Sequence, residues 1–378
     1  MRIRQFAVSI AGAIGLMLSL PASATWVASW VAPPHAPLGT EGPFAAAAYD
    51  NVTLSQILRV SEGGEKLRIR FSNRYGPGPL TIGAARVVRI DDAGKEIDGS
   101  SRMLTFGGAG EAVIPRGAPF VTDVVQLAVP SLSRLKVEFY LPKATGPCTC
   151  HLTGVDELAV SPPGNFVGKP FTPVSKAQFR AFLSAVEVDS PKALGTIVAF
   201  GDSITDGVGA TAGANRRWPD ILANRLQAAG KHWAVANSAI SGMGEAALAR
   251  FDEDVLSLPN VKYIIVFEGV NDIGNRFGRR GPNQPNLPGL DQPEITVDQM
   301  IAGYRQLIAR AHEKGIKVIG SPIGPYKGAS YWSEEGEAAR QKINDWILKG
   351  GAFDGIVRLD LAFADPADTR QMREGYHM

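Results

Sequence analysis

The strongest constraint on the fold is a change in hydrophobic pattern near residue 190. Before it, short segments such as KLRIRFSN, LTIGAARVVRI, VVQLAVP and LKVEFYL alternate apolar with polar residues, and clusters rich in Gly and Pro separate them. Such alternation is typical of half-buried antiparallel strands. Residues 25–190 are therefore predicted to form an all-β domain, a sandwich of the jelly-roll kind.

Beyond residue 194, nearly continuous apolar segments alternate with amphipathic helical ones. This pattern favours a parallel sheet covered by helices on both faces. Five predicted strands and four intervening helices indicate a flavodoxin-like three-layer α/β domain over residues 195–378. The predicted strands are TIVAFG, WAVANSA, VKYIIVFEG, IKVIGSP and GIVRLDLA.

The first 24 residues have the features of a secretory signal peptide. Arg2 and Arg4 precede the apolar stretch FAVSIAGAIGLMLSL, and small residues follow up to Ala24, the predicted cleavage point. The stretch is shorter than the roughly 20 residues that span a bilayer, and no other segment approaches that length. We therefore expect a soluble mature chain without a membrane span, exported to the periplasm or the medium.

Charge and cysteine usage exclude other classes. With 39 basic and 37 acidic residues, the chain has no strong field of one sign, so nucleic acid is not an expected partner. Cys148 and Cys150 lie one residue apart, which is not the spacing of a structural zinc site. They are expected to be free or strained thiols at the surface, and we expect neither a metal nor an organic cofactor.

Small and amide-bearing residues follow three successive strands of the predicted parallel sheet. Ser203 follows the first strand, Gly242 the second and Asn271 the third. Ligands gather outside the carboxyl ends of such strands, so these residues should meet at one edge. Each alone would suit a turn or a helix cap. Together they predict acyl transfer, with Ser203 attacking a carbonyl and the N–H groups of Ser203, Gly242 and the Asn271 side chain binding the oxyanion.

The segments GDSITDG, NSAISG and GVND resemble the first three sequence blocks of the SGNH or GDSL-type esterase and lipase superfamily. The resemblance implies the same roles for Ser203, Gly242 and Asn271. WVASW and the β segments after it are similar to an N-terminal β domain in a secreted branch of that family. The resemblance to this family implies a carboxylic ester hydrolase that forms an acyl-enzyme. Its implied substrates are short acyl or acetyl esters, for example acetyl groups on glycans, or alternatively lipid esters.

A nucleophilic serine needs a base, and the family carries it in a fourth block, Asp-x-x-His. The nearest match here is Glu374-Gly375-Tyr376-His377. Glu374 and His377 would complete the catalytic set if glutamate orients the imidazole. The favoured alternative is that the chain stops before the true base, because chain ends are commonly poorly ordered. A catalytically impaired glycan-binding or surface-interaction protein is then the competing function. Of the other histidines, His35 and His151 lie in the predicted β domain, His232 precedes the second strand on the wrong side of the sheet, and His312 lies late in a long predicted helix.

Overall fold

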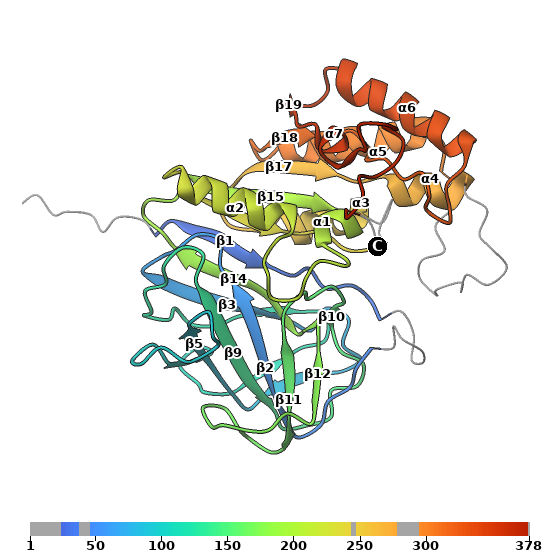
Figure 1. Ribbon diagram of the computed structural model, residues 1–378. Helices are drawn as coiled ribbons and strands as arrows, with labels where there is room; N and C mark the ends of the chain where they lie inside the picture. Colours follow the sequence, from blue (N-terminus) through green and yellow to red (C-terminus); the bar gives the residue numbers. More distant parts are fainter. Residues whose placement is uncertain (1–23, 38–45, 243–246, 278–294, 377–378) are drawn as a thin grey trace, which may run out of the picture.

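The computed structural model describes residues 24–37, 46–242, 247–277 and 295–376 (Figure 1). The predicted signal peptide lies outside these ranges except for Ala24. No helix among the described residues is both long and apolar enough to cross a bilayer.

The amino-terminal region is built mainly from two antiparallel sheets. One sheet has the order β1 (Trp26–Val31), β14 (Leu183–Asp189), β3 (Lys66–Ser72), β8 (Pro119–Val121). The other has the order β12 (Ser175–Ala177), β11 (Leu158–Pro163), β2 (Val52–Arg59), β9 (Arg134–Leu141), β5 (Ala84–Ile90), β6 (Arg102–Met103). Two short pairs join β4 (Leu80–Ile82) to β7 (Ala112–Ile114) and β10 (Cys150–His151) to β13 (Arg180–Ala181).

The predicted alternation places one apolar core between the two large sheets. In β3 every second side chain is buried, and Phe71 meets Phe139 of β9 edge to face at 5.2 Å between ring centres. Both rings are fully buried, so the two sheets pack as a sandwich. The expected strand VVQLAVP is wrong. That segment only forms isolated bridges, Val125 with Leu67 and Val129 with Gly64, so it never builds a ladder.

The expectation of surface thiols is also wrong. Cys148 and Cys150 are buried and joined by a disulfide. Backbone bridges from Ala48 to Pro147 and from His35 to Cys150 hold this segment against the sandwich core, which draws both sulfurs inside.

The carboxyl-terminal region is a five-stranded parallel sheet with helices, and its strand order confirms the predicted flavodoxin-like arrangement. The order is β16 (Trp233–Asn237), β15 (Gly195–Gly201), β17 (Val261–Phe267), β18 (Lys317–Gly320), β19 (Gly355–Ile356). The helices are α1 (Ser203–Asp206), α2 (Trp218–Ala228), α3 (Ala247–Phe251), the π-helical η1 (Asp252–Leu256), α4 (Val270–Phe277), α5 (Val297–His312), α6 (Glu334–Lys349) and α7 (Leu359–Phe363).

The last predicted strand, GIVRLDLA, is mostly wrong. Only Gly355 and Ile356 pair with β18, because β18 itself ends at Gly320, and Leu359–Phe363 forms α7. The segment therefore turns into a helix as soon as its pairing partner ends.

The two regions share a contact in which β1 lies beside the parallel sheet (Figure 1). The Ala28 N–H donates to Thr196 Oγ1 at 3.0 Å, and the Val235 N–H donates to Ser61 Oγ at 2.9 Å. Ala28 and Val31 of β1 also belong to the same apolar cluster as the core of the parallel sheet. The β region is therefore packed onto the α/β region and can support its loops.

Candidate functional site

The segments that follow the neighbouring strands β16, β15 and β17 meet at one edge of the parallel sheet. Gly201, the last residue of β15, is in register with Phe267, the last residue of β17. The Ile240 N–H, beyond the end of β16, donates to the Gly201 carbonyl at 3.1 Å. The edge thus carries Ser203, two residues after Gly201, together with the segments that hold Gly242 and Asn271.

Ser203 is half-buried and is the first residue of α1. Asp202 caps this helix, its Oδ1 accepting from the Ile204 N–H at 2.9 Å. A Cβ added to Gly201 would lie 2.3 Å from the Phe267 carbonyl oxygen, so only glycine fits where the chain turns from strand to helix. Ser203 is therefore held in a tight strand-to-helix turn at the sheet edge.

Three hydrogen-bond donors at this edge are unused. Within the part of the chain that the structure describes, the backbone N–H groups of Ser203 and Gly242 donate to no acceptor. Gly242 has φ +77°, a left-handed conformation that favours glycine. The Asn271 Nδ2 is buried and has no hydrogen-bond partner among the described residues. A buried donor without a partner costs about 1–3 kcal/mol, so this amide needs an explanation beyond folding.

Arg250, which sequence reasoning missed, ties two of the strand ends together. Its Nη1 donates to the Ser238 carbonyl at 2.7 Å and its Nη2 to the Gly201 carbonyl at 3.2 Å. The guanidinium is buried and lies 4.2 Å from the centre of the Phe200 ring. In the sequence, only its spacing to Asp254 was visible, and that spacing indicated no more than a pair on one helix face.

Buried carboxyl groups also lie at this edge, among them Asp202, Glu268 and Asp272. Burial above all, together with the nearby Asp272 and Asp206 carboxylates, raises the pKa of Asp202 to about 7 against the lowering effect of the Ile204 N–H. Burial, followed by the Asp202 charge, holds the pKa of Glu268 well above its usual range. The edge therefore carries an electrostatic cost that folding alone does not require.

Replacing Asp202 with asparagine should stabilise the protein in a pH-dependent manner. The folded pKa of Asp202 is about 7, and its usual value is near 4. The contribution of Asp202 to the free energy of unfolding is therefore fully present below pH 4 and is lost as pH rises through 7. Asp202→Asn should raise the free energy of unfolding by about 3 kcal/mol at pH 8 and much less at pH 4.5, since the asparagine oxygen can still cap α1. Urea denaturation at the two pH values measures this. An equal change at both would contradict it.

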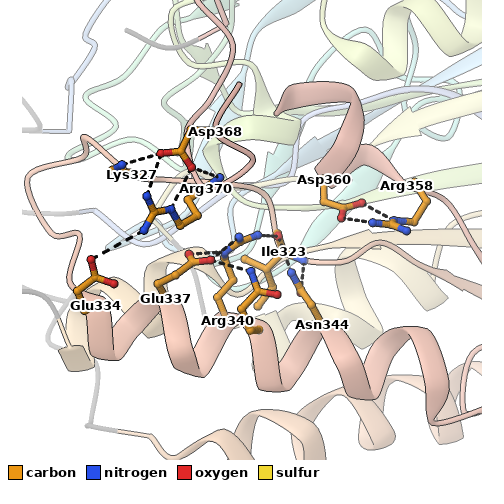
Figure 2. Close-up of polar contacts among 11 residues, drawn as sticks. Ile323, Lys327, Glu334, Glu337, Arg340, Asn344, Arg358, Asp360, Asp368 and Arg370 are labelled. Atoms are coloured by element: carbon orange, nitrogen blue, oxygen red, sulfur yellow. Dashed lines mark hydrogen bonds and ion pairs between the residues drawn. The ribbon is translucent and has the colours of Figure 1, made fainter. Parts of the chain in front are cut away.

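The segment after α7 is fastened by ion pairs (Figure 2). Asp368 accepts from Lys327 Nζ at 2.6 Å and from Arg370 Nε at 3.0 Å. Beside them, Asn344 of α6 binds both the N–H and the carbonyl of Ile323. These contacts anchor the carboxyl-terminal segment against the loop that follows β18.

A row of aromatic rings leads from this segment back to the sheet edge. The Tyr376 ring lies edge to face on Phe363 at 5.8 Å between centres, and Phe363 stacks on Phe267 at 5.9 Å. Phe267 ends β17, just before Asn271. Glu374 is exposed, and His377 lies outside the described residues. The described chain therefore ends close to the edge that carries Ser203.

Comparison with known proteins gives one family match. Residues 199–378 match the model of the GDSL-like Lipase/Acylhydrolase family. No curated protein matches the chain.

Similar solved structures share low sequence identity with the chain. A GDSL-like lipase from Bacteroides thetaiotaomicron is 16% identical with TM-score 0.34, over 49% of this chain and 77% of that one. AlinE4, an SGNH-hydrolase family esterase, is 19% identical with TM-score 0.35, over 47% and 82%. A variant of Axe2, an acetyl-xylooligosaccharide esterase from Geobacillus, is 21% identical with TM-score 0.34, over 45% and 78%. Similarity at this level does not extend to substrate.

Proposed function

We propose that this protein hydrolyses carboxylic esters with Ser203 as its nucleophile, because residues 199–378 match the model of the GDSL-like Lipase/Acylhydrolase family. The observation that carries the proposal is the set of unused donors at the sheet edge: the N–H groups of Ser203 and Gly242 and the buried Asn271 amide. A carbonyl oxygen that gains negative charge is the acceptor such donors suit best. The desolvation cost of the buried Asn271 amide is then offset in the transition state.

The proposed reaction has two steps. Ser203 Oγ attacks the ester carbonyl carbon while its proton passes to a base, and the carbonyl oxygen becomes an oxyanion held by the three donors. The tetrahedral intermediate collapses, the alcohol leaves with the proton, and the acyl group stays on Ser203. Water then attacks the acyl-enzyme with the help of the same base, which releases the acid and restores the hydroxyl.

We assign the base to His377, with Glu374 as its orienting partner. The support is the aromatic row of Tyr376, Phe363 and Phe267, in which Phe363 links the residue before His377 to the end of β17. The ion pairs of Asp368 restrain the segment that leads there. A base at this place would share an edge with Ser203.

We propose short acyl esters, acetyl esters of glycans among them, as the substrate class, and lipid esters as the alternative. Export to the periplasm or the medium is supported by two features. The first 24 residues have the signal-peptide pattern, and the buried Cys148–Cys150 disulfide suits an oxidising compartment.

Labelling by an organophosphate tests the proposed function. Diethyl p-nitrophenyl phosphate should react once per chain, release one equivalent of p-nitrophenol and leave a diethylphosphoryl group on the peptide that contains Ser203, because only an activated serine attacks phosphorus at a useful rate. Peptide mass spectrometry locates the adduct. His377→Ala should slow the labelling without moving it. A label elsewhere, or none while p-nitrophenyl acetate also stays intact, would favour the impaired binding protein.

A further inference from the structure

A buried polar chain crosses from the β region to the edge of the parallel sheet. His151 Nδ1 lies 2.9 Å from the Pro33 carbonyl oxygen, and His151 Nε2 lies 3.0 Å from Asp206 Oδ1. Asp206 Oδ2 accepts from the Ser241 N–H at 3.1 Å and from Ser241 Oγ at 2.9 Å. Thr153 Oγ1 lies 3.0 Å from Ser241 Oγ. Two residues of the β region thus reach Asp206 and Ser241.

The direction of each hydrogen bond follows from what the groups can donate. An ionised Asp206 only accepts, so Ser241 Oγ gives it its single hydrogen, and Thr153 Oγ1 must donate to Ser241. Both ring nitrogens of His151 face oxygen atoms, so Nδ1–H donates to the Pro33 carbonyl and Nε2 shares a hydrogen with Asp206 Oδ1. Each carboxylate oxygen of Asp206 is therefore bonded, and the hydrogen bonds from His151 and from Ser241 converge on this carboxylate.

This chain of hydrogen bonds ends at the peptide unit that carries the Gly242 N–H. Ser241 is held at both its backbone N–H and its side chain, and the next N–H along the chain is that of Gly242. Asp206 is the last residue of α1, the helix that Ser203 begins. One carboxylate therefore links the proposed nucleophile helix to a proposed oxyanion donor.

Holding the two regions together does not by itself explain why these buried hydrogen bonds are present. His151 and Asp206 are 5% and 2% exposed, and a buried ion pair is weak support for stability compared with apolar packing. Apolar contacts and other hydrogen bonds already join the regions, for example Arg59 Nη2 to Asn224 Oδ1 at 2.8 Å. The additional effect of the hydrogen bonds through Asp206 is to fix the position of Ser241.

We propose that His151 and Thr153 of the β region are positioning residues for ester hydrolysis, acting through Asp206 and Ser241 to hold the Gly242 N–H toward the oxyanion. The inference rests on the proposed function. In this proposal the β region takes part in the reaction, because its residues His151 and Thr153 help to orient a proposed oxyanion donor. Supporting contacts of this kind set how well preorganised donors bind the transition state.

Thr153→Val tests the inference with little change in shape, since it removes the hydroxyl that donates to Ser241. For p-nitrophenyl acetate, kcat should fall about tenfold with KM nearly unchanged, less than the 100-fold or more lost when an oxyanion donor itself is removed. Thr153→Ser should restore kcat because it keeps the donor. Asn224→Ala, which removes another hydrogen bond between the same regions, should leave kcat unchanged.

A double-mutant cycle with Ser241→Ala identifies the route. If Thr153 acts only through Ser241, the double variant should match Ser241→Ala alone. Hydrogen exchange at the Ser241 amide, whose acceptor is Asp206, should speed up in Thr153→Val and His151→Ala but not in Asn224→Ala.

The outcomes separate the inference from the proposed function. Additive effects on kcat, a kcat in Thr153→Val within twofold of wild type, or unchanged exchange at Ser241 would overturn the positioning role alone. A wild-type protein without ester turnover would contradict the proposed function, and with it the catalytic part of the inference.

Discussion

Ser203→Ala is expected to lower kcat for p-nitrophenyl acetate by about 10⁴-fold or more, the scale seen when a catalytic serine is removed from a triad enzyme. The physical reason is that the acyl-enzyme cannot form without the Oγ atom. Uncatalysed attack by water then remains, helped only by the unused N–H donors at the edge. Initial rates of p-nitrophenol release measure the loss.

The stability of the Ser203→Ala variant should stay close to that of the wild type, because the Asp202 side chain, not that of Ser203, caps α1. Ser257→Ala is a matched control, since Ser257 is exposed and follows η1 away from the edge. It should keep the wild-type rate. Turnover in Ser203→Ala at more than a tenth of the wild-type kcat would remove Ser203 from the mechanism.

Sequence pattern predicted the larger architecture because hydrophobic period reports burial directly. The alternation in Lys66–Ser72 predicted β3, and the apolar run ending at Gly201 predicted β15, an interior strand of the parallel sheet. The pattern failed at Val125 and Val129, where apolar residues alternate but the backbone forms only isolated bridges, to Leu67 and Gly64. Hydrophobic periodicity indicates which side chains are buried, but it does not indicate whether the backbone forms continuous hydrogen bonds with a neighbouring strand.

The supporting shell of the site could not be predicted from the sequence. Asp206 stands in GDSITDG, so its nearness to Ser203 was visible, but its partner His151 is 55 residues earlier in the chain. No local spacing encodes a contact across two regions. Cys148 and Cys150 were misplaced for a related reason, because their burial depends on bridges to Ala48 and His35 that a local pattern does not show.

Asn271→Ala is expected to separate activity from stability. Truncation removes the third proposed oxyanion donor, so kcat for p-nitrophenyl acetate should fall about 100- to 1000-fold with KM little changed. The buried Nδ2 has no partner among the described residues, and its removal relieves a desolvation cost. The free energy of unfolding should therefore hold steady or rise by about 1 kcal/mol, because the cavity left by the short side chain partly offsets the gain.

The opposite signs of these two effects make the Asn271 variant decisive. If Asn271 only shaped the turn into α4, its truncation would lower stability, and activity would fall with it. If the amide serves an oxyanion, activity falls while the fold keeps or gains stability, as expected for a group that is unsatisfied until the transition state forms. Parallel urea denaturation and steady-state kinetics distinguish the two, and a joint loss of stability and kcat would contradict the oxyanion role.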